Sequence, residues 1–172
     1  MRMRNRSSQM PADMRILAID PGYDRLGIAV LESDASRPIL LWSDCVTPDK
    51  GARERRLASV SKAITSLIEE YSPDILAIET LFFGVNKKTA FGVAEARGAI
   101  LAAAGCTSLS VVEYSPQQVK SAVTGHGGSD KIAVARMIPR LLTLSEKKRT
   151  DDELDAIAIG ITALSFSQRV IA

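Results

Sequence analysis

The chain has little cysteine, little histidine and no long apolar run. Its 172 residues include 2 cysteines, Cys45 and Cys106, and 1 histidine, His126. Two thiols are too few for a disulfide scaffold, and a single imidazole excludes a multi-histidine zinc site. No apolar stretch approaches the ~20 residues that a membrane span requires. The composition therefore favours a protein of a reducing, intracellular compartment such as the cytoplasm.

Net charge is also small, but the charges are unevenly distributed. The formal net charge is +2 at pH 7. Residues 115–149 contain seven basic side chains and two acidic ones, a local net charge of +5, and the next residues are strongly acidic. A basic surface beside an acidic cluster is typical of a phosphodiester enzyme, whose basic residues hold the polyanion and whose acids hold metal. A solvated charged face is the alternative interpretation of each run.

The hydrophobic pattern predicts a single α/β domain over residues 14–172. Apolar runs predict five strands, at 15–19, 27–31, 39–46, 74–78 and 108–113, and the first two form a hairpin. Helical spacing predicts helices over 53–71, 89–104, 115–123, from 129 onward and over 151–168. Such an order favours a mixed five-stranded sheet flanked by helices. Residues 1–13 are expected to be a disordered basic arm, not a secretory signal.

Two acidic residues end two strands of nearly the same sequence. Asp20 follows Ile-Leu-Ala-Ile, and Glu79 follows the same four residues. In an open α/β sheet, functional groups gather where parallel strands end. The two acids would therefore lie side by side if the first and fourth strands are neighbours. Each acid alone could be a polar residue that simply ends a strand, but the pair favours a functional site.

The last predicted helix supplies a second acidic pair. Asp152 and Asp155 are three residues apart and share one helix face, while apolar residues pack inward, namely Ala156, Ile159 and Ala163. Asp151 is a rival to Asp152, because it lies four residues before Asp155. An acidic first turn that the helix dipole favours is the alternative. A carboxylate cluster selects hard cations such as Mg²⁺ or Mn²⁺, and two of them can cleave a phosphodiester bond.

Five groups of residues occur in a fixed order between Arg15 and Thr162. They are Ile-Asp-Pro-Gly at 19–22 with Gly27, Ala-Ile-Glu at 77–79 with Phe82, Glu-Ala-Arg-Gly at 95–98, Gln-Val-Lys at 118–120 with 127–131, and Asp-Glu-Leu-Asp-Ala-Ile at 152–157. The first group alone is weak, since sugar-kinase-type ATPases carry a similar hairpin. The ordered set resembles the RuvC family of Holliday-junction resolvases.

The resemblance implies a ribonuclease H-like fold and a set of functional residues. Asp20, Glu79, Asp152 and Asp155 match the family's catalytic, metal-binding acids. The implied cofactor is Mg²⁺, for which Mn²⁺ can substitute, with two ions per site. The implied protein is a homodimer that cuts symmetric strands of four-way junction DNA. A branch-migration complex of the RuvA and RuvB type is an implied further partner.

Three more residues match family positions that contact DNA. Phe82 matches an aromatic residue that disturbs base stacking near the crossover, although a core role is the commoner one for such a residue. Lys120 and Lys131 match lysines that bind DNA or support catalysis; on spacing alone they would be ordinary surface lysines.

The chain departs from the family in two places. Pro139 should break or kink the helix that begins near residue 129. His126 stands in a glycine-rich loop where the family has an apolar residue, and is expected to be exposed to solvent. The helix over 89–104 carries small residues, and either a dimer contact or packing on its own sheet would explain them.

Three other functions compete with junction cleavage. A related nuclease of the YqgF type, acting on RNA, would keep the fold and change the substrate. A junction-binding scaffold without activity is a second alternative, but all four acids are present. An ATP-handling protein ranks last, because the chain lacks a Walker-type glycine-rich loop.

Overall fold

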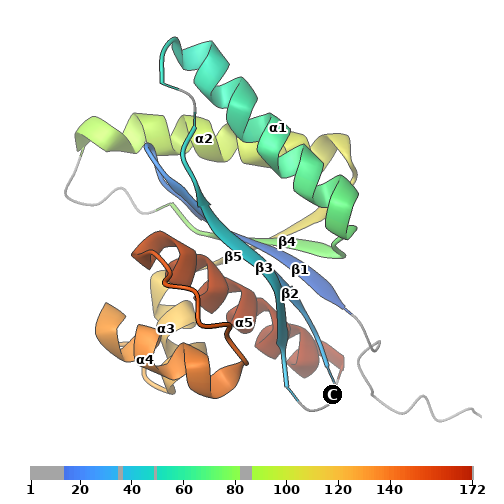
Figure 1. Ribbon diagram of the computed structural model, residues 1–172, viewed down its shortest axis with the longest axis vertical. Helices are drawn as coiled ribbons and strands as arrows, with labels where there is room; N and C mark the ends of the chain where they lie inside the picture. Colours follow the sequence, from blue (N-terminus) through green and yellow to red (C-terminus); the bar gives the residue numbers. More distant parts are fainter. Residues whose placement is uncertain (1–13, 35–36, 49, 82–86, 172) are drawn as a thin grey trace, which may run out of the picture.

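Five strands form a mixed sheet in the order β3-β2-β1-β4-β5 (Figure 1). The computed structural model describes residues 14–34, 37–48, 50–81 and 87–171. The strands are β1 (Arg15–Pro21), β2 (Leu26–Glu32), β3 (Ile39–Val46), β4 (Ile75–Glu79) and β5 (Ser110–Tyr114). The helices are α1 (Arg53–Tyr71), α2 (Lys87–Cys106), α3 (Pro116–Thr124), α4 (Lys131–Leu141) and α5 (Asp151–Ile171). The expected mixed five-stranded sheet flanked by helices is confirmed.

The first strand lies at the centre of the sheet and has one partner of each kind. β1 pairs antiparallel with β2, with Asp20 opposite Gly27, and β2 pairs antiparallel with β3. On its other side β1 pairs parallel with β4, with Ile19 beside Ile78, and β4 pairs parallel with β5. The first and fourth strands are therefore neighbours, and the acids that follow their apolar runs lie at the same end of the two strands.

Helices cover both faces of the sheet, as Figure 1 shows. Alternate residues of a strand point to opposite faces, so each strand contributes to two cores. Leu17 and Ile19 pack against α1 and α2, whose buried residues include Ile64 and Ile100. The intervening residues Ile16 and Ala18 pack in a second cluster with α3, α4 and α5. Residues 156–164 of α5 are buried, because this helix lies directly on β1 and β2.

The helix ends follow recognisable local signals, with one correction at α4. Ser115 and Gln118 form a capping box at the start of α3, with Pro116 in its first turn. Asp130 caps α4 through the backbone N–H of Ala133. The predicted break at Pro139 is wrong in position, because α4 continues to Leu141. The proline removes only one hydrogen bond in the last turn, and the Leu142 N–H still donates to the Ile138 carbonyl at 3.1 Å.

Two expectations concern the chain outside this core. The expected basic arm over 1–13 lies outside the described residues. Among the helices that are described, none is both long enough and apolar enough to cross a membrane.

Candidate active site

The acids at the carboxyl ends of β1 and β4 lie side by side. Both are partly buried, and both line a hollow of about 230 Å³ with Thr80, Val93 and Pro116 among its walls. The Thr80 hydroxyl is buried in this place and has no hydrogen-bond partner among the described residues. The hollow therefore combines two carboxylates, Asp20 and Glu79, with an unsatisfied oxygen.

The second acidic pair reaches the same place from α5. The start of this helix lies directly over the β1–β2 pair, at a point where only glycine fits. A Cβ atom added to Gly27 would lie 1.8 Å from the Asp152 carbonyl oxygen and 2.4 Å from its carbonyl carbon. Since Gly27 pairs with Asp20, the close approach brings Asp152 and Asp155 over the strand that carries Asp20.

Burial, and then the neighbouring carboxylates, raise the pKa values of the strand acids. The pKa of Asp20 is raised from 3.8 to about 7, chiefly by burial and then by the charges of Asp155, Glu79 and Asp152, with Lys131 opposing. The pKa of Glu79 is raised by burial and by Asp155, while Lys131 and Lys120 oppose the shift. Asp152 is partly buried, its backbone lies against Gly27 and its charge adds to the raised pKa of Asp20, whereas Asp151 is exposed to solvent. The geometry therefore favours Asp152 over its rival.

Two basic side chains hold the helix acids. Lys131 Nζ, at the start of α4, lies 2.6 Å from Asp155 Oδ2, and this bond is the main cause of a raised pKa for Lys131. An Arg25 guanidinium nitrogen, from the β1–β2 turn, lies 2.9 Å from Asp152 Oδ2. No three acidic, histidine or cysteine side chains among the described residues already stand in a metal-ligand arrangement.

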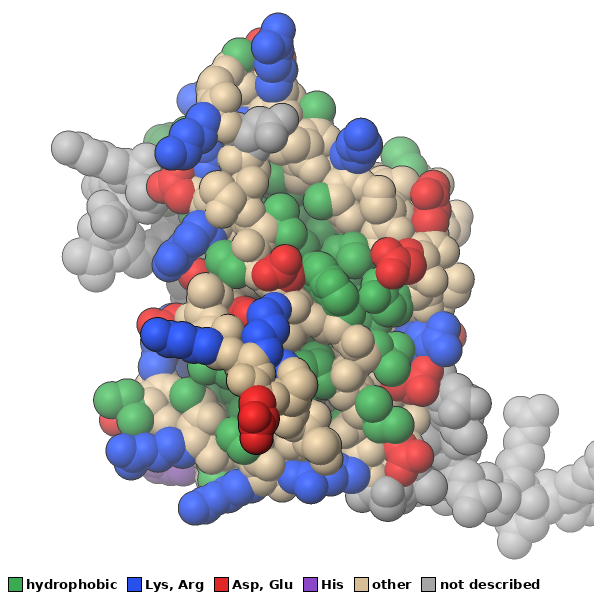
Figure 2. Space-filling model, viewed as in Figure 1, with side chains coloured by type: hydrophobic (Ala, Val, Ile, Leu, Met, Phe, Trp, Pro, Cys, Tyr) green, Lys and Arg blue, Asp and Glu red, His purple; other side chains and the backbone are tan. Residues whose placement is uncertain are grey.

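The other residues expected at the site have different outcomes. Lys120, on α3, is partly buried and near enough to Glu79 to lower its pKa. Phe82 lies outside the described residues. His126 is exposed in the loop between α3 and α4, as expected. Of the predicted basic surface, Figure 2 shows Lys and Arg side chains over α4 and the segment that leads into α5, with acidic side chains between them.

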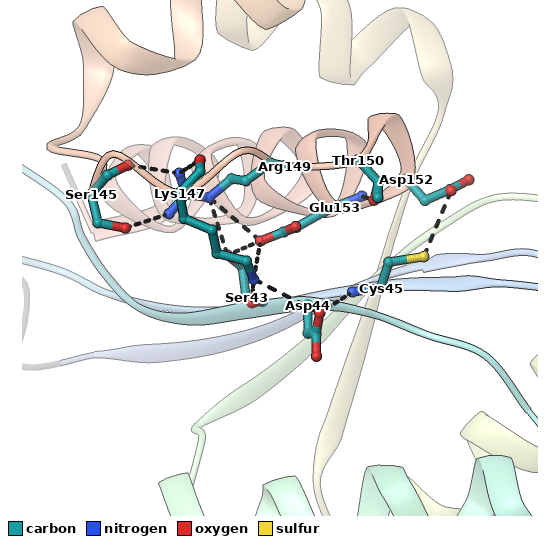
Figure 3. A network of polar contacts seen from close by, with 9 residues as sticks. All are labelled: Ser43, Asp44, Cys45, Ser145, Lys147, Arg149, Thr150, Asp152 and Glu153. Atoms are coloured by element: carbon teal, nitrogen blue, oxygen red, sulfur yellow. Dashed lines mark hydrogen bonds and ion pairs between the residues drawn. The ribbon is translucent and has the colours of Figure 1, made fainter.

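Sequence reasoning missed Glu153, which lies at the centre of the network in Figure 3. Its side chain is 2% exposed and accepts a 2.6 Å hydrogen bond from the Ser43 hydroxyl of β3. Lys147 Nζ lies 3.1 Å and Arg149 Nε 3.4 Å from the same carboxylate oxygen. Glu153 therefore ties the start of α5, between Asp152 and Asp155, to β3 and to the segment before the helix.

Two further residues near the acids were given no role from the sequence. The largely buried Arg97 of α2 donates to the Glu79 carbonyl at 2.7 Å and pairs with Glu113 of β5 at 2.6 Å, so it fixes the ends of two adjacent strands. The Cys45 thiol of β3 lies 3.7 Å from Asp152 Oδ2. The Glu-Ala-Arg-Gly motif pointed to Arg97, but no local pattern indicated Cys45.

The donor set suits a hard divalent cation. Carboxylates from β1, β4 and α5 lie close together, and the charges of Asp155, Glu79 and Asp152 add to burial in raising the pKa of Asp20, with Lys131 opposing. A divalent cation would relieve this repulsion, and Mg²⁺ and Mn²⁺ prefer oxygen ligands of this kind. The residues present therefore fit such an ion.

The fold and the site together define a class of protein. A mixed sheet of this strand order, with acids at the ends of its central parallel strands and more acids on a helix that crosses it, is the framework of the ribonuclease H-like nucleases.

Comparison with known proteins places the chain within that class. The family model described as "Crossover junction endodeoxyribonuclease RuvC" matches residues 16–163. The proteins of that name from Moorella thermoacetica and Thermosipho melanesiensis are each 44% identical to this chain, covering 90% and 86% of it and 93% and 94% of their own lengths. The chain belongs to the RuvC family.

Solved structures agree with this assignment. RuvC from Thermus thermophilus, in complex with a Holliday junction substrate, superimposes with a TM-score of 0.85 at 31% identity and covers 92% of this chain and 98% of that one. The yeast mitochondrial Holliday junction resolvase Ydc2 has a TM-score of 0.70 at 13% identity, covering 92% of this chain and 80% of its own, and shows the shared fold alone.

Proposed function

We infer that this chain is a crossover junction endodeoxyribonuclease that resolves four-way (Holliday) DNA junctions by paired symmetric nicks. One observation carries the inference: acids from β1, β4 and α5 converge in a chain that matches the family over residues 16–163. The relatives at 44% identity are named for this activity, and the Thermus thermophilus structure holds a junction substrate.

We assign the catalytic role to Asp20, Glu79, Asp152 and Asp155, which would hold two Mg²⁺ ions per site, with Mn²⁺ able to substitute. Cations held by these four residues would supply an activated water for attack on phosphorus and charge to stabilise the departing 3′ oxygen. The raised pKa of Asp20 means that a fraction of this side chain holds a proton near neutral pH in the metal-free protein. Cation binding therefore competes with that proton.

The lysines at the site have two tasks in this proposal. Lys131, bonded to Asp155, and Lys120, near Glu79, offset part of the carboxylate charge. Both also lie where they can bind phosphates of the DNA backbone. Phe82 is assigned the role of stacking on a base at the crossover, where such stacking is worth roughly 1–3 kcal/mol per base; this role stays a prediction.

Symmetric cleavage calls for a homodimer, and we propose that α2 forms its contact. Phe91 is 77% exposed on this helix, and Gly98 and Ala102 are exposed on the same side. A Cβ atom at Gly98 would meet nothing within 4 Å, whereas Ile100 and Ala103 face the sheet. The small residues therefore leave room for a second helix to approach. Phe91→Glu should shift sedimentation toward a monomer.

Two further proposals rest on family membership. A branch-migration complex of the RuvA and RuvB type would present the junction to the enzyme. Because the proposed substrate arises during recombination and repair of the chromosome, the activity would be located with the DNA in the cytoplasm.

The test is cleavage of a synthetic four-way junction with a homologous core, beside a linear duplex of matching sequence. Paired symmetric nicks are expected in the junction alone, with Mg²⁺ and not with a chelator. Asp20→Asn should bind the junction without cutting it. Cleavage of the linear duplex at the same rate, or full cleavage by Asp20→Asn, would contradict the proposed function.

A further inference from the structure

Arg25 pairs with one of the candidate metal-binding acids, and beyond this ion pair it has been given no role so far. One of its guanidinium nitrogens lies 2.9 Å from Asp152 Oδ2, yet its side chain is 58% exposed. A guanidinium has five N–H donors in a plane. A single ion pair occupies a fraction of them, and the exposed remainder is open to a second, anionic partner.

Contacts with α1 and α2 hold the turn that carries Arg25. Arg56 of α1, whose side chain is 13% exposed, donates to the Tyr23 carbonyl and to Asp24 Oδ1, the latter at 2.9 Å. Its guanidinium carbon also lies 4.4 Å from the centre of the Tyr23 ring. The same ring also packs against Gly92 of α2, where an added Cβ would lie 1.8 Å from a ring carbon. The backbone that presents Arg25 is therefore fixed in place.

Arg25 and a divalent cation would compete for the same carboxylate. Asp152 Oδ2 is the oxygen that Arg25 contacts, and it also accepts from Cys45. A cation that takes Asp152 as a ligand weakens its attraction for the guanidinium, and the guanidinium is then left beside the cation on a fixed turn. Arginine suits phosphate in such a position, because its planar donors match two phosphate oxygens.

We propose that Arg25 is a phosphate-binding residue of this site: it neutralises Asp152 in the metal-free protein, and divalent cation binding releases it to contact the DNA phosphate next to the cleaved bond. The proposal rests on the proposed function, since it presumes that DNA enters this site. Lys131 has the corresponding relation to Asp155, but the lysine is a point charge and lacks the planar pair of donors.

The first experiment measures how junction affinity depends on salt, in Ca²⁺ and in chelator, for the wild type and Arg25→Gln. Each phosphate contact contributes about 0.9 to the slope of log affinity against log salt. In Ca²⁺, Arg25→Gln should make this dependence on salt shallower by about that amount. In chelator, the variant should have the same slope as the wild type. Arg25→Lys, which keeps the charge, should retain most of the slope and lose cleavage rate.

The matched control is Arg15→Gln, which removes the same charge from the opposite end of β1, where Arg15 pairs with Glu32 at 2.6 Å. This variant should show the wild-type slope in both conditions. Equal slopes for Arg25→Gln and the wild type in Ca²⁺ would overturn the proposal, as would an equal loss in Ca²⁺ and in chelator.

The second experiment needs no DNA and no activity. Because Arg25 competes for Asp152, Arg25→Gln should bind Mn²⁺ about two- to fivefold more tightly in a calorimetric titration, the range expected for removing an exposed ion pair. Unchanged or weaker Mn²⁺ binding would contradict the competition. If the wild type neither bound nor cut the junction, the proposed function would be refuted. If the wild type cut the junction but Arg25→Gln changed neither the salt dependence of binding nor the affinity for Mn²⁺, only the inference about Arg25 would be refuted.

Discussion

The most informative perturbation is Asp20→Asn in the absence of metal, because it should make the protein more stable. Burial and three neighbouring carboxylates raise the pKa of Asp20 from 3.8 to about 7. A group whose pKa is raised by folding favours the folded state only while it holds its proton. The wild type should therefore lose stability as the pH rises from about 4 to about 7, relative to a variant with an uncharged amide.

The size of the effect follows from the shift. Each pKa unit corresponds to about 1.4 kcal/mol, so a shift of this size amounts to on the order of 4 kcal/mol at pH 8. Neighbouring carboxylates relax and part of this difference is lost, so we expect about 2–4 kcal/mol in the free energy of unfolding. At pH 5 the difference between the two proteins should be much smaller.

The assay is urea denaturation in chelator at pH 5 and pH 8. Glu69→Gln, which removes an exposed carboxylate from α1, is the control and should change little at either pH. Adding Mg²⁺ at pH 8 should stabilise the wild type more than Asp20→Asn, because binding to the folded state adds to its stability. If Asp20→Asn were no more stable than the wild type in chelator at pH 8, the cost assigned to the buried Asp20 charge among its neighbouring carboxylates would be wrong.

Three further substitutions test how the acids are positioned. Gly27→Ala places a Cβ 1.8 Å from the Asp152 carbonyl oxygen, so the start of α5 must shift; single-turnover cleavage should fall about 100-fold with junction affinity retained, and an unchanged rate would refute the close approach. Glu153→Gln removes the charge that pairs with Lys147 and Arg149, and should lower the free energy of unfolding by about 1.5–3 kcal/mol in urea; a neutral result would mean that the network is not stabilising. Arg97→Lys loses the fork that holds Glu79 and Glu113, and should reduce the cleavage rate about 10-fold without changing the Kd for the junction; a changed Kd with a normal rate would contradict a positioning role.

The sequence was sufficient for the parts of the site that depend on strand ends. Ile-Leu-Ala-Ile occurs before both Asp20 and Glu79, and a strand that is buried on both faces must be apolar along its length. Whether the two strands are neighbours stayed a condition of that argument, and the parallel pairing of Ile19 with Ile78 in the structure fulfils it. Helical spacing also placed Asp155 ahead of a buried face, but spacing alone left Asp151 as a rival to Asp152.

Local sequence patterns could not predict the contacts that hold the four acids in place. Glu153 bonds to Ser43, 110 residues away in sequence, and an acidic residue in the first turn of a helix ordinarily faces solvent. One signal was present: Glu153 precedes Ala156 and Ile157 by three and four residues, and both are fully buried. The ion pair of Arg25 with Asp152 had no such signal, because it depends on how the turn and the helix meet.

The position of α5 has a consequence for how the protein is made. This helix supplies Asp152 and Asp155 and also covers the β1 and β2 face of the sheet. During synthesis, the strand acids Asp20 and Glu79 leave the ribosome long before their partners do, and the sheet face remains uncovered until α5 follows. Contacts so distant in sequence form late. Before α5 follows, a nascent chain carries two acids of the cluster and can close only the core between the sheet and α1 and α2. The ability to cut DNA therefore arises in the same step that completes the second core.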